Sequence, residues 1–160
     1  MHTPSRARPV PSADFDFMIG SWDAAITMPG HQPLVGRWEA RYLLDGQIVL
    51  DHLQIVDRAG RPLRSVATLR TWVPSDRCWT ATFLYAEAPR QHVELRGSRD
   101  GDEIHLTAHD LESGATATVR FFDITATTFR WEQRNHADHD VEDPAIAIRC
   151  TRASTNEAGT

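Results

Sequence analysis

The chain has 160 residues, of which 41% are hydrophobic and 24% charged, and its formal net charge is −5 at pH 7. This length predicts one domain with a core of its own. The acidic balance argues against nucleic-acid binding, which needs a basic face, and no apolar run in the sequence is long enough to span a membrane. We therefore expect a cytoplasmic protein without a nucleic-acid or membrane partner.

The two ends of the chain are polar. Residues 1–13 are rich in proline and lack the apolar stretch of a signal peptide, and residues 153–160 are small and polar. They predict a disordered lead-in and a disordered tail around one domain that covers residues 14–152. The two cysteines, Cys78 and Cys150, form neither a disulfide framework nor a metal-binding spacing, which is typical of a reduced cytoplasmic protein.

The chain begins its ordered part with the apolar stretch 15–22, whose sequence is FDFMIGSW. It ends in Gly20-x-Trp22, so a compact apolar segment leads through a glycine into a strand that opens with a large side chain. We predict that this stretch forms a short turn or helix that plugs one end of the fold, with Trp22 as its floor.

Short alternating segments make up the rest of the chain. Hydrophobic residues recur at every second position, the period of a half-buried strand, and turn residues separate the segments. The predicted strands are residues 22–28, 34–44, 47–56, 63–72, 78–86, 90–96, 103–109, 117–121, 129–134 and 143–151. Tight turns such as Asp45-Gly46 favour antiparallel neighbours. Because a closed barrel leaves no strand edge unpaired, we predict an all-β fold, a single antiparallel up-and-down barrel of about ten strands.

Three motifs resemble a known family. The opening 15–23, the Trp72-Val73-Pro74 run before Trp79, and Phe129-x-Trp131 look like an uncharacterised bacterial family of calycin-type barrels. Members of that family often begin with Phe-Asp-Phe followed by Gly-x-Trp. The resemblance spans residues 14–152 and implies a closed barrel with an internal cavity, without implying a reaction.

Two other branches of the calycins suggest further features. Lipocalins share the Gly-x-Trp motif and place an arginine of the last strand over that tryptophan, so this resemblance implies the same role for Arg149 or Arg152. Nitrobindin, a more distant resemblance, binds haem and has a longer glycine-rich start. This chain continues with Asp23, Ala24 and Ala25 after Trp22, so we expect no haem and no other cofactor.

Large aromatic residues occupy many of the positions predicted to face inward, and small residues lie between them. The small residues are Gly36, Ala40, Ser65, Ala67, Ala81, Ala108 and Ala117, and they leave room for a ligand. The aromatic candidates for ligand binding are Trp38, Tyr42, Trp79, Phe83, Tyr85, Phe129 and Trp131. An apolar pocket with a few polar groups is the usual small-molecule site. The competing interpretation is that these aromatics are ordinary core residues.

Polar side chains on the same strands are candidates for contacting a ligand. Gln54, Gln91 and Gln133 could donate hydrogen bonds to a ligand or satisfy a neighbour. On residues 47–56 either His52 or Asp51 faces inward, since adjacent strand residues point to opposite faces unless a bulge intervenes. We favour His52 as the cavity acid or base, with Asp51 as the alternative.

Metal binding is the last candidate chemistry. The loop 136–143 contains histidines and carboxylates that suit a divalent ion, but a solvated turn explains the same residues and we expect no metal. His105 and His109 share a polar face with Glu103, which we place outside the barrel.

The sequence thus predicts a protein that binds a small, largely apolar or aromatic molecule in a barrel cavity. The alternative is a cofactor-independent enzyme of cyclase, isomerase or dehydratase type, in which His52 or Asp51, together with Tyr85, assists the reaction. A homodimer is compatible with either function.

Overall fold

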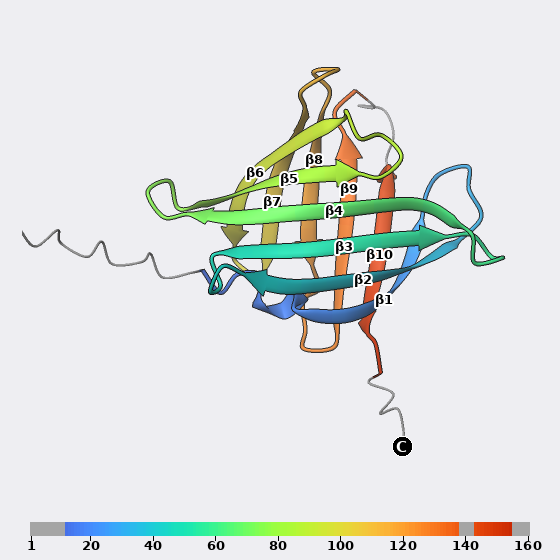
Figure 1. Ribbon diagram of the computed structural model, residues 1–160, viewed down its shortest axis with the longest axis horizontal. Coiled ribbons are helices and arrows are strands. Elements are labelled where there is room, and N and C mark those ends of the chain that lie inside the picture. Colours follow the sequence, from blue (N-terminus) through green and yellow to red (C-terminus); the bar gives the residue numbers. More distant parts are fainter. Residues whose placement is uncertain (1–11, 138–142, 155–160) are drawn as a thin grey trace, which may run out of the picture.

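The computed structural model describes residues 12–137 and 143–154, and in it ten antiparallel strands close into one barrel (Figure 1). The strands are β1 (Gly20–Thr27), β2 (Leu34–Leu43), β3 (Ile48–Val56), β4 (Pro62–Val73), β5 (Cys78–Tyr85), β6 (His92–Asp100), β7 (Glu103–Asp110), β8 (Thr116–Phe122), β9 (Thr128–Asn135) and β10 (Ile146–Arg152). Each strand pairs with its neighbours in sequence, and β10 pairs with β1 to close the barrel. The predicted all-β barrel is confirmed, while the predicted lead-in and tail fall largely outside the described residues.

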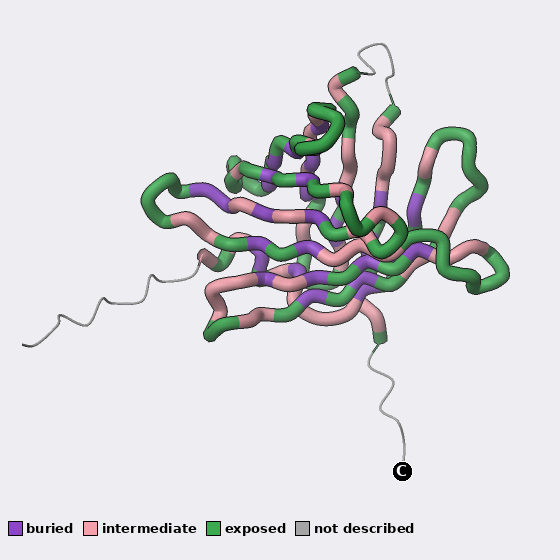
Figure 2. Tube along the Cα trace, turned by 45° about the horizontal axis from the view of Figure 1, so that its top comes forward, coloured by how far each residue is buried: buried purple, intermediate pink, exposed green. Residues whose placement is uncertain are grey.

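Buried and exposed residues alternate along the strands, as Figure 2 shows. In β1, for example, Trp22, Ala24 and Ile26 are buried, and Asp23 and Thr27 are exposed. This alternation places one set of side chains inside the barrel and the other in solvent. Among the described residues, no helix combines the length and apolar character needed to cross a bilayer.

One end of the barrel is closed by the segment before β1. A single 3₁₀ turn, η1 (Asp16–Met18), follows Phe15, and the side chains of Phe15 and Met18 are fully buried. Trp22 is fully buried as well, and its Nε1–H donates to the Met18 carbonyl at 2.7 Å. The prediction of a plug with Trp22 as its floor is confirmed.

Arg152 at the end of β10 fastens this plug. Its guanidinium carbon lies 4.1 Å from the centre of the Trp22 ring, and its Nη1 and Nη2 donate to the carbonyls of Ile19 at 3.0 Å and Phe17 at 3.2 Å. Arg149 is exposed, so Arg152 is the arginine that covers Trp22. The close approach leaves no room beside Gly20, where an added Cβ would lie 2.7 Å from Arg152 Nη1.

The inward face of β4 differs from the prediction. Ser65 and Ala67 were expected inside, but Thr68 and Arg70 are the fully buried residues of this strand, and Val66 shares their parity. The face with fewer charges looked like the inner one, and the structure instead buries a charged side chain. The physical reason is that β3 provides a buried carboxylate that forms an ion pair with Arg70.

Candidate functional site

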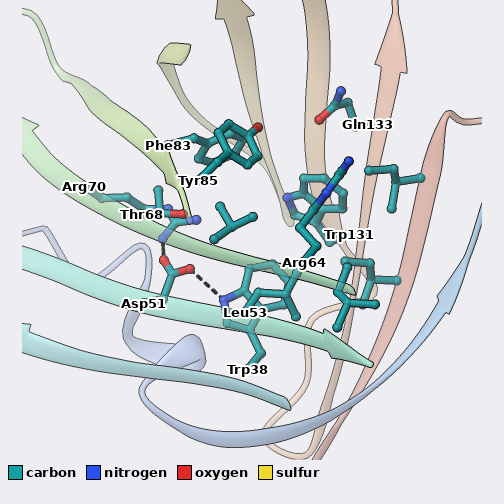
Figure 3. Close-up of a pocket in the computed structure, with 14 residues that line it drawn as sticks. Trp38, Asp51, Leu53, Arg64, Thr68, Arg70, Phe83, Tyr85, Trp131 and Gln133 are labelled. Carbon is teal, nitrogen blue, oxygen red and sulfur yellow. Dashed lines mark hydrogen bonds and ion pairs between the residues drawn. The ribbon is translucent and has the colours of Figure 1, made fainter. Parts of the chain in front are cut away.

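A cavity of about 80 Å³ lies inside the barrel, between the plug and the open end (Figure 3). Its walls are mostly apolar. They are formed by Trp38, Leu53, Ile55, Val66, Phe83, Trp131, Ile146 and Ile148. Strands β2, β3, β4, β5, β9 and β10 contribute these side chains, so the walls belong to the rigid barrel rather than to its loops.

An ion pair forms one side of the cavity. The Asp51 carboxylate on β3 contacts the Arg70 guanidinium on β4, and each side chain is only 1% exposed. Trp38 on β2 donates from its Nε1–H to Asp51 Oδ1 at 2.7 Å. Figure 3 shows the two charged groups meeting head to head, with Thr68 beside Arg70. The cavity therefore combines apolar walls with one fixed dipole.

The strand register brings these residues together. Asp51 is directly opposite Ala40 on β2 and Thr68 on β4. Trp38 and Arg70 each lie two positions further along, on the same face, and long side chains reach such diagonal neighbours. Asp51 is thus the centre of a three-strand cluster.

Arg70 also contacts the plug. Its guanidinium carbon lies 5.0 Å from the Phe15 ring centre and 5.6 Å from that of Phe121. Burial lowers the pKa of Arg70 to about 9, which leaves the group protonated at neutral pH. Within the described chain, its Nε has no hydrogen-bond partner. This nitrogen is a buried donor without an acceptor.

Polar side chains lie toward the open end. Arg64, Tyr85 and Gln133 line the cavity there. Arg64 Nε lies 3.8 Å from Glu87 Oε1. Burial raises the pKa of the Tyr85 hydroxyl, and the nearby Arg64 opposes part of that rise. The phenol is therefore neutral at pH 7 and can donate or accept a hydrogen bond.

A second hollow of about 340 Å³ adjoins the cavity at the open end and shares Tyr85 and Gln133 with it. Ala108 of β7 and Ala117 of β8 are among its lining residues, together with Gln91 and Asp110. Gln91 Nε2 donates to Asp110 Oδ2 at 3.0 Å. The two shared side chains therefore lie at the boundary between the two spaces.

The structure gathers about half of the predicted site residues in this region. Those that line the cavity are Trp38, Asp51, Phe83, Tyr85, Trp131 and Gln133, and Gln91 lines the second hollow. The remaining candidates lie elsewhere, in two groups.

The first group points to solvent. His52 is exposed and its Nε2 lies 2.6 Å from Ser65 Oγ on the outer face. Gln54 is exposed on the same face. The expectation that His52 faces the cavity is wrong, because β3 is regular at this point and turns Asp51 inward, which turns His52 and Gln54 outward.

The second group belongs to the closed end. The Tyr42 hydroxyl donates to Asp16 Oδ1, and Trp79 Nε1 donates to Asp14 Oδ2 at 3.1 Å. Phe129 is fully buried, with its ring centre 4.8 Å from that of Trp22. These aromatics hold the plug, as the competing core interpretation expected.

Sequence reasoning missed Arg64, Thr68 and Arg70. They share one parity of β4, which carries two arginines and so looked like an outer face. The signal that could have found them is Asp51, because an inward carboxylate needs a cationic partner on a neighbouring strand.

The candidate metal loop is only partly described, since residues 138–142 lie outside the described part. His136, at its start, has both ring nitrogens occupied: Nδ1 lies 2.8 Å from Thr116 Oγ1 and Nε2 lies 2.7 Å from Thr118 Oγ1. Within residues 12–137 and 143–154, no three histidine, cysteine or acidic residues are grouped as metal ligands would be.

Comparisons with known proteins reveal likeness in structure alone. No family model and no curated protein matches the chain. Rv2717c from M. tuberculosis superposes with a TM-score of 0.64 at 15% identity, over 91% of this chain and 100% of that one. A redesigned β-barrel matches with a TM-score of 0.50 at 11% identity, over 91% and 98%. Another redesigned barrel, mFAP1, solved bound to DFHBI, has a TM-score of 0.49 at 13% identity, over 88% and 100%.

At identities this low the likeness shows the fold alone. This chain shares its barrel architecture with Rv2717c and with the first redesigned barrel. The comparisons lend no support to membership of the uncharacterised bacterial family that the opening motif resembles.

Proposed function

We propose that this barrel binds a small, largely apolar or aromatic molecule in the cavity that Asp51 and Arg70 line on one side. The proposal rests on one observation: the cavity has apolar walls, and a buried ion pair forms one of its sides. Barrel interiors of comparable strand number are wide enough for one small ligand. Small-molecule sites typically combine apolar walls with a few well-placed polar groups.

The ion pair supports a ligand site better than a purely structural role. Removing two charges from water costs several kcal/mol per ion, and apolar residues of similar volume are often as stable or more stable. An ion pair at a cavity wall is therefore a weak source of stability. Its cost is explained if the pair orients a ligand, since perturbed charged groups gather at functional sites.

Binding is favoured over the alternative of a cofactor-independent enzyme. Among the described side chains that line the cavity, the titratable groups are Asp51, Arg64, Arg70 and Tyr85. Asp51 already faces Trp38 and Arg70, so its oxygens are engaged. The ordinary pKa of a tyrosine, 10.0, already keeps the Tyr85 phenol protonated at pH 7, and burial raises its pKa further. General base catalysis needs a group that is free to take a proton, and His52 is on the outer face.

Toluene provides a direct test, because it is a small apolar ring without a polar group. Titration of the ¹⁵N-labelled protein with toluene, followed by NMR, should shift the signals of the cavity residues. Val66→Phe fills the cavity and should abolish these shifts. Val35→Phe makes the same change on the outer face, where Val35 is 56% exposed, and should leave them intact. Binding that survives Val66→Phe would reject the proposal, as would the failure of toluene and of other single-ring probes to bind the parent protein.

A further inference from the structure

Resting on the proposed ligand binding, we infer that the ligand carries a neutral hydrogen-bond acceptor, such as a ketone or amide carbonyl, on a single-ring or similarly small apolar body. The acceptor is seated against the Arg70 guanidinium, and the body lies between Trp38, Trp131 and the aliphatic walls. The inference follows from three properties of the cavity: its hydrogen-bonding balance, its charge and its size.

The polar side of the cavity has more donors than acceptors. Both oxygens of Asp51 face donors already, Oδ1 the Trp38 indole and Oδ2 the Arg70 Nη1. Arg70 has five N–H groups and no acceptor, and its Nε is unpaired within the described residues. The guanidinium lines the cavity beside Thr68, as Figure 3 shows. The guanidinium thus has more N–H donors than protein acceptors, and a ligand acceptor placed against it adds a hydrogen bond that the protein does not supply.

The charge of the site excludes an anion as the favoured group. Asp51 balances Arg70, so the buried pair is neutral overall. A carboxylate placed beside it would add a second negative charge next to Asp51 inside apolar walls, which is unfavourable. The positive charge of Arg64 does not offset the negative charge of a carboxylate beside Arg70, since the Arg64 side chain is 43% exposed and lies near Glu87. A neutral acceptor meets the donors without this cost.

The size of the cavity limits the buried part of the ligand. About 80 Å³ is less than the several hundred that a drug-sized ligand occupies. A larger ligand would have to continue past Tyr85 and Gln133 into the second hollow. The portion that contacts Arg70 is therefore small, with its acceptor at one end.

Three probes of the same size separate these claims. Acetophenone, α-methylstyrene and benzoate each have one ring and the same number of non-hydrogen atoms. They offer Arg70 a neutral acceptor, no acceptor and an anion, respectively. Dissociation constants from NMR titration should show acetophenone binding roughly tenfold more tightly than α-methylstyrene, with benzoate the weakest. The Arg70 guanidinium N–H signals should shift more with acetophenone than with α-methylstyrene.

Two double variants supply the controls. Asp51→Leu with Arg70→Met removes the pair and identifies the Arg70 signal, and it should abolish the advantage of acetophenone. Asp23→Leu with Arg37→Met removes a solvent-exposed pair, at 3.4 Å on the outer face, and should preserve that advantage.

The outcomes distinguish the inference from the function on which it rests. Equal binding of acetophenone and α-methylstyrene, or tightest binding of benzoate, overturns the inference while ligand binding stands. Failure of toluene and of all three probes to bind rejects the proposed function and the inference with it. The ligand preference of the parent protein is informative even if the buried double variant does not fold.

Discussion

Asp51 and Arg70 form a fully buried ion pair although they are not directly opposite each other on their strands. Asp51 faces Thr68 across the β3–β4 pairing, and Arg70 faces Val49. The pair is diagonal, and the Trp38 indole holds the carboxylate from the other side. Three strands therefore share one polar cluster in an otherwise apolar interior.

Removal of one charge from this cluster should be far more damaging than removal of both. Asp51→Ala leaves Arg70 buried without its counter-charge, and we expect a loss of roughly 3–5 kcal/mol in the free energy of unfolding. Asp51→Leu combined with Arg70→Met should be close to the parent protein or more stable. Urea titration measures both. Equal losses in the single and double variants would show that the charges are not coupled.

Burial at the cavity rim should be visible in the titration of Tyr85. The chain has two tyrosines, so in Tyr42→Phe the ultraviolet signal of tyrosinate comes from Tyr85 alone. Desolvation raises the pKa of Tyr85 above its ordinary value of 10.0, so the midpoint should lie above that value. A midpoint at or below 10 would contradict its burial.

The same shift has a consequence for stability. At a pH between the pKa of Tyr85 in the unfolded chain and its higher pKa in the folded protein, only the folded protein keeps the phenol proton. The free energy of unfolding therefore falls as pH rises through that window. Below pH 10 Tyr85 is protonated in both states, and its contribution to the free energy of unfolding is fully present. Tyr85→Phe should flatten the decline of stability above pH 10, which urea titrations at several pH values would measure.

Two adjacent residues of β3 test the corrected orientation of that strand. Leu53 lines the cavity, and Leu53→Ala should cost about 2–5 kcal/mol, as buried leucine truncations do. His52 points to solvent, so His52→Ala should stay within about 0.5 kcal/mol. Toluene affinity should respond to the first change alone. If His52→Ala altered toluene binding, the assignment of the outer face would be wrong.

The sequence predicted the barrel well because period-two alternation and turn residues are local signals. Trp22, Ala24 and Ile26 alternate with polar neighbours in β1, and the buried pattern follows them closely. The Gly20-x-Trp22 motif likewise predicted the closed end, because it combines a glycine, which allows the backbone to turn, with a large apolar side chain. Arg149 and Arg152 could not be separated, since the choice depends on where β10 ends against the plug.

The site was harder to predict because it depends on pairing between strands. Residues of β3 alternate equally well with either parity inward, so Asp51 and His52 could not be distinguished locally. Burial of Arg70 is favourable only in the presence of Asp51, and neither strand reveals this alone. The positions of Tyr42 and Trp79 at the closed end were hard to predict for a related reason: depth along the barrel axis decides whether an inward aromatic contacts the plug or the cavity.

Gly20 and Gly30 form a matched pair for testing the plug. Both have positive φ angles, +121° and +76°, so alanine is strained at each position. An added Cβ at Gly20 would lie 2.7 Å from Arg152 Nη1, and at Gly30 it would meet nothing within 4 Å. Gly20→Ala must therefore also displace the guanidinium that covers Trp22 and binds the carbonyls of Phe17 and Ile19.

We expect Gly20→Ala to lower the free energy of unfolding by at least about 1 kcal/mol more than Gly30→Ala, since it breaks contacts as well as straining the backbone. Urea titration gives the comparison, and the tryptophan fluorescence, to which Trp22 contributes, should shift only in the Gly20 variant. In an Arg152→Met background the contact is already absent, so the excess cost of Gly20→Ala should shrink toward zero. An excess that persists in that background would mean that backbone strain alone, and not Arg152, requires glycine at this position.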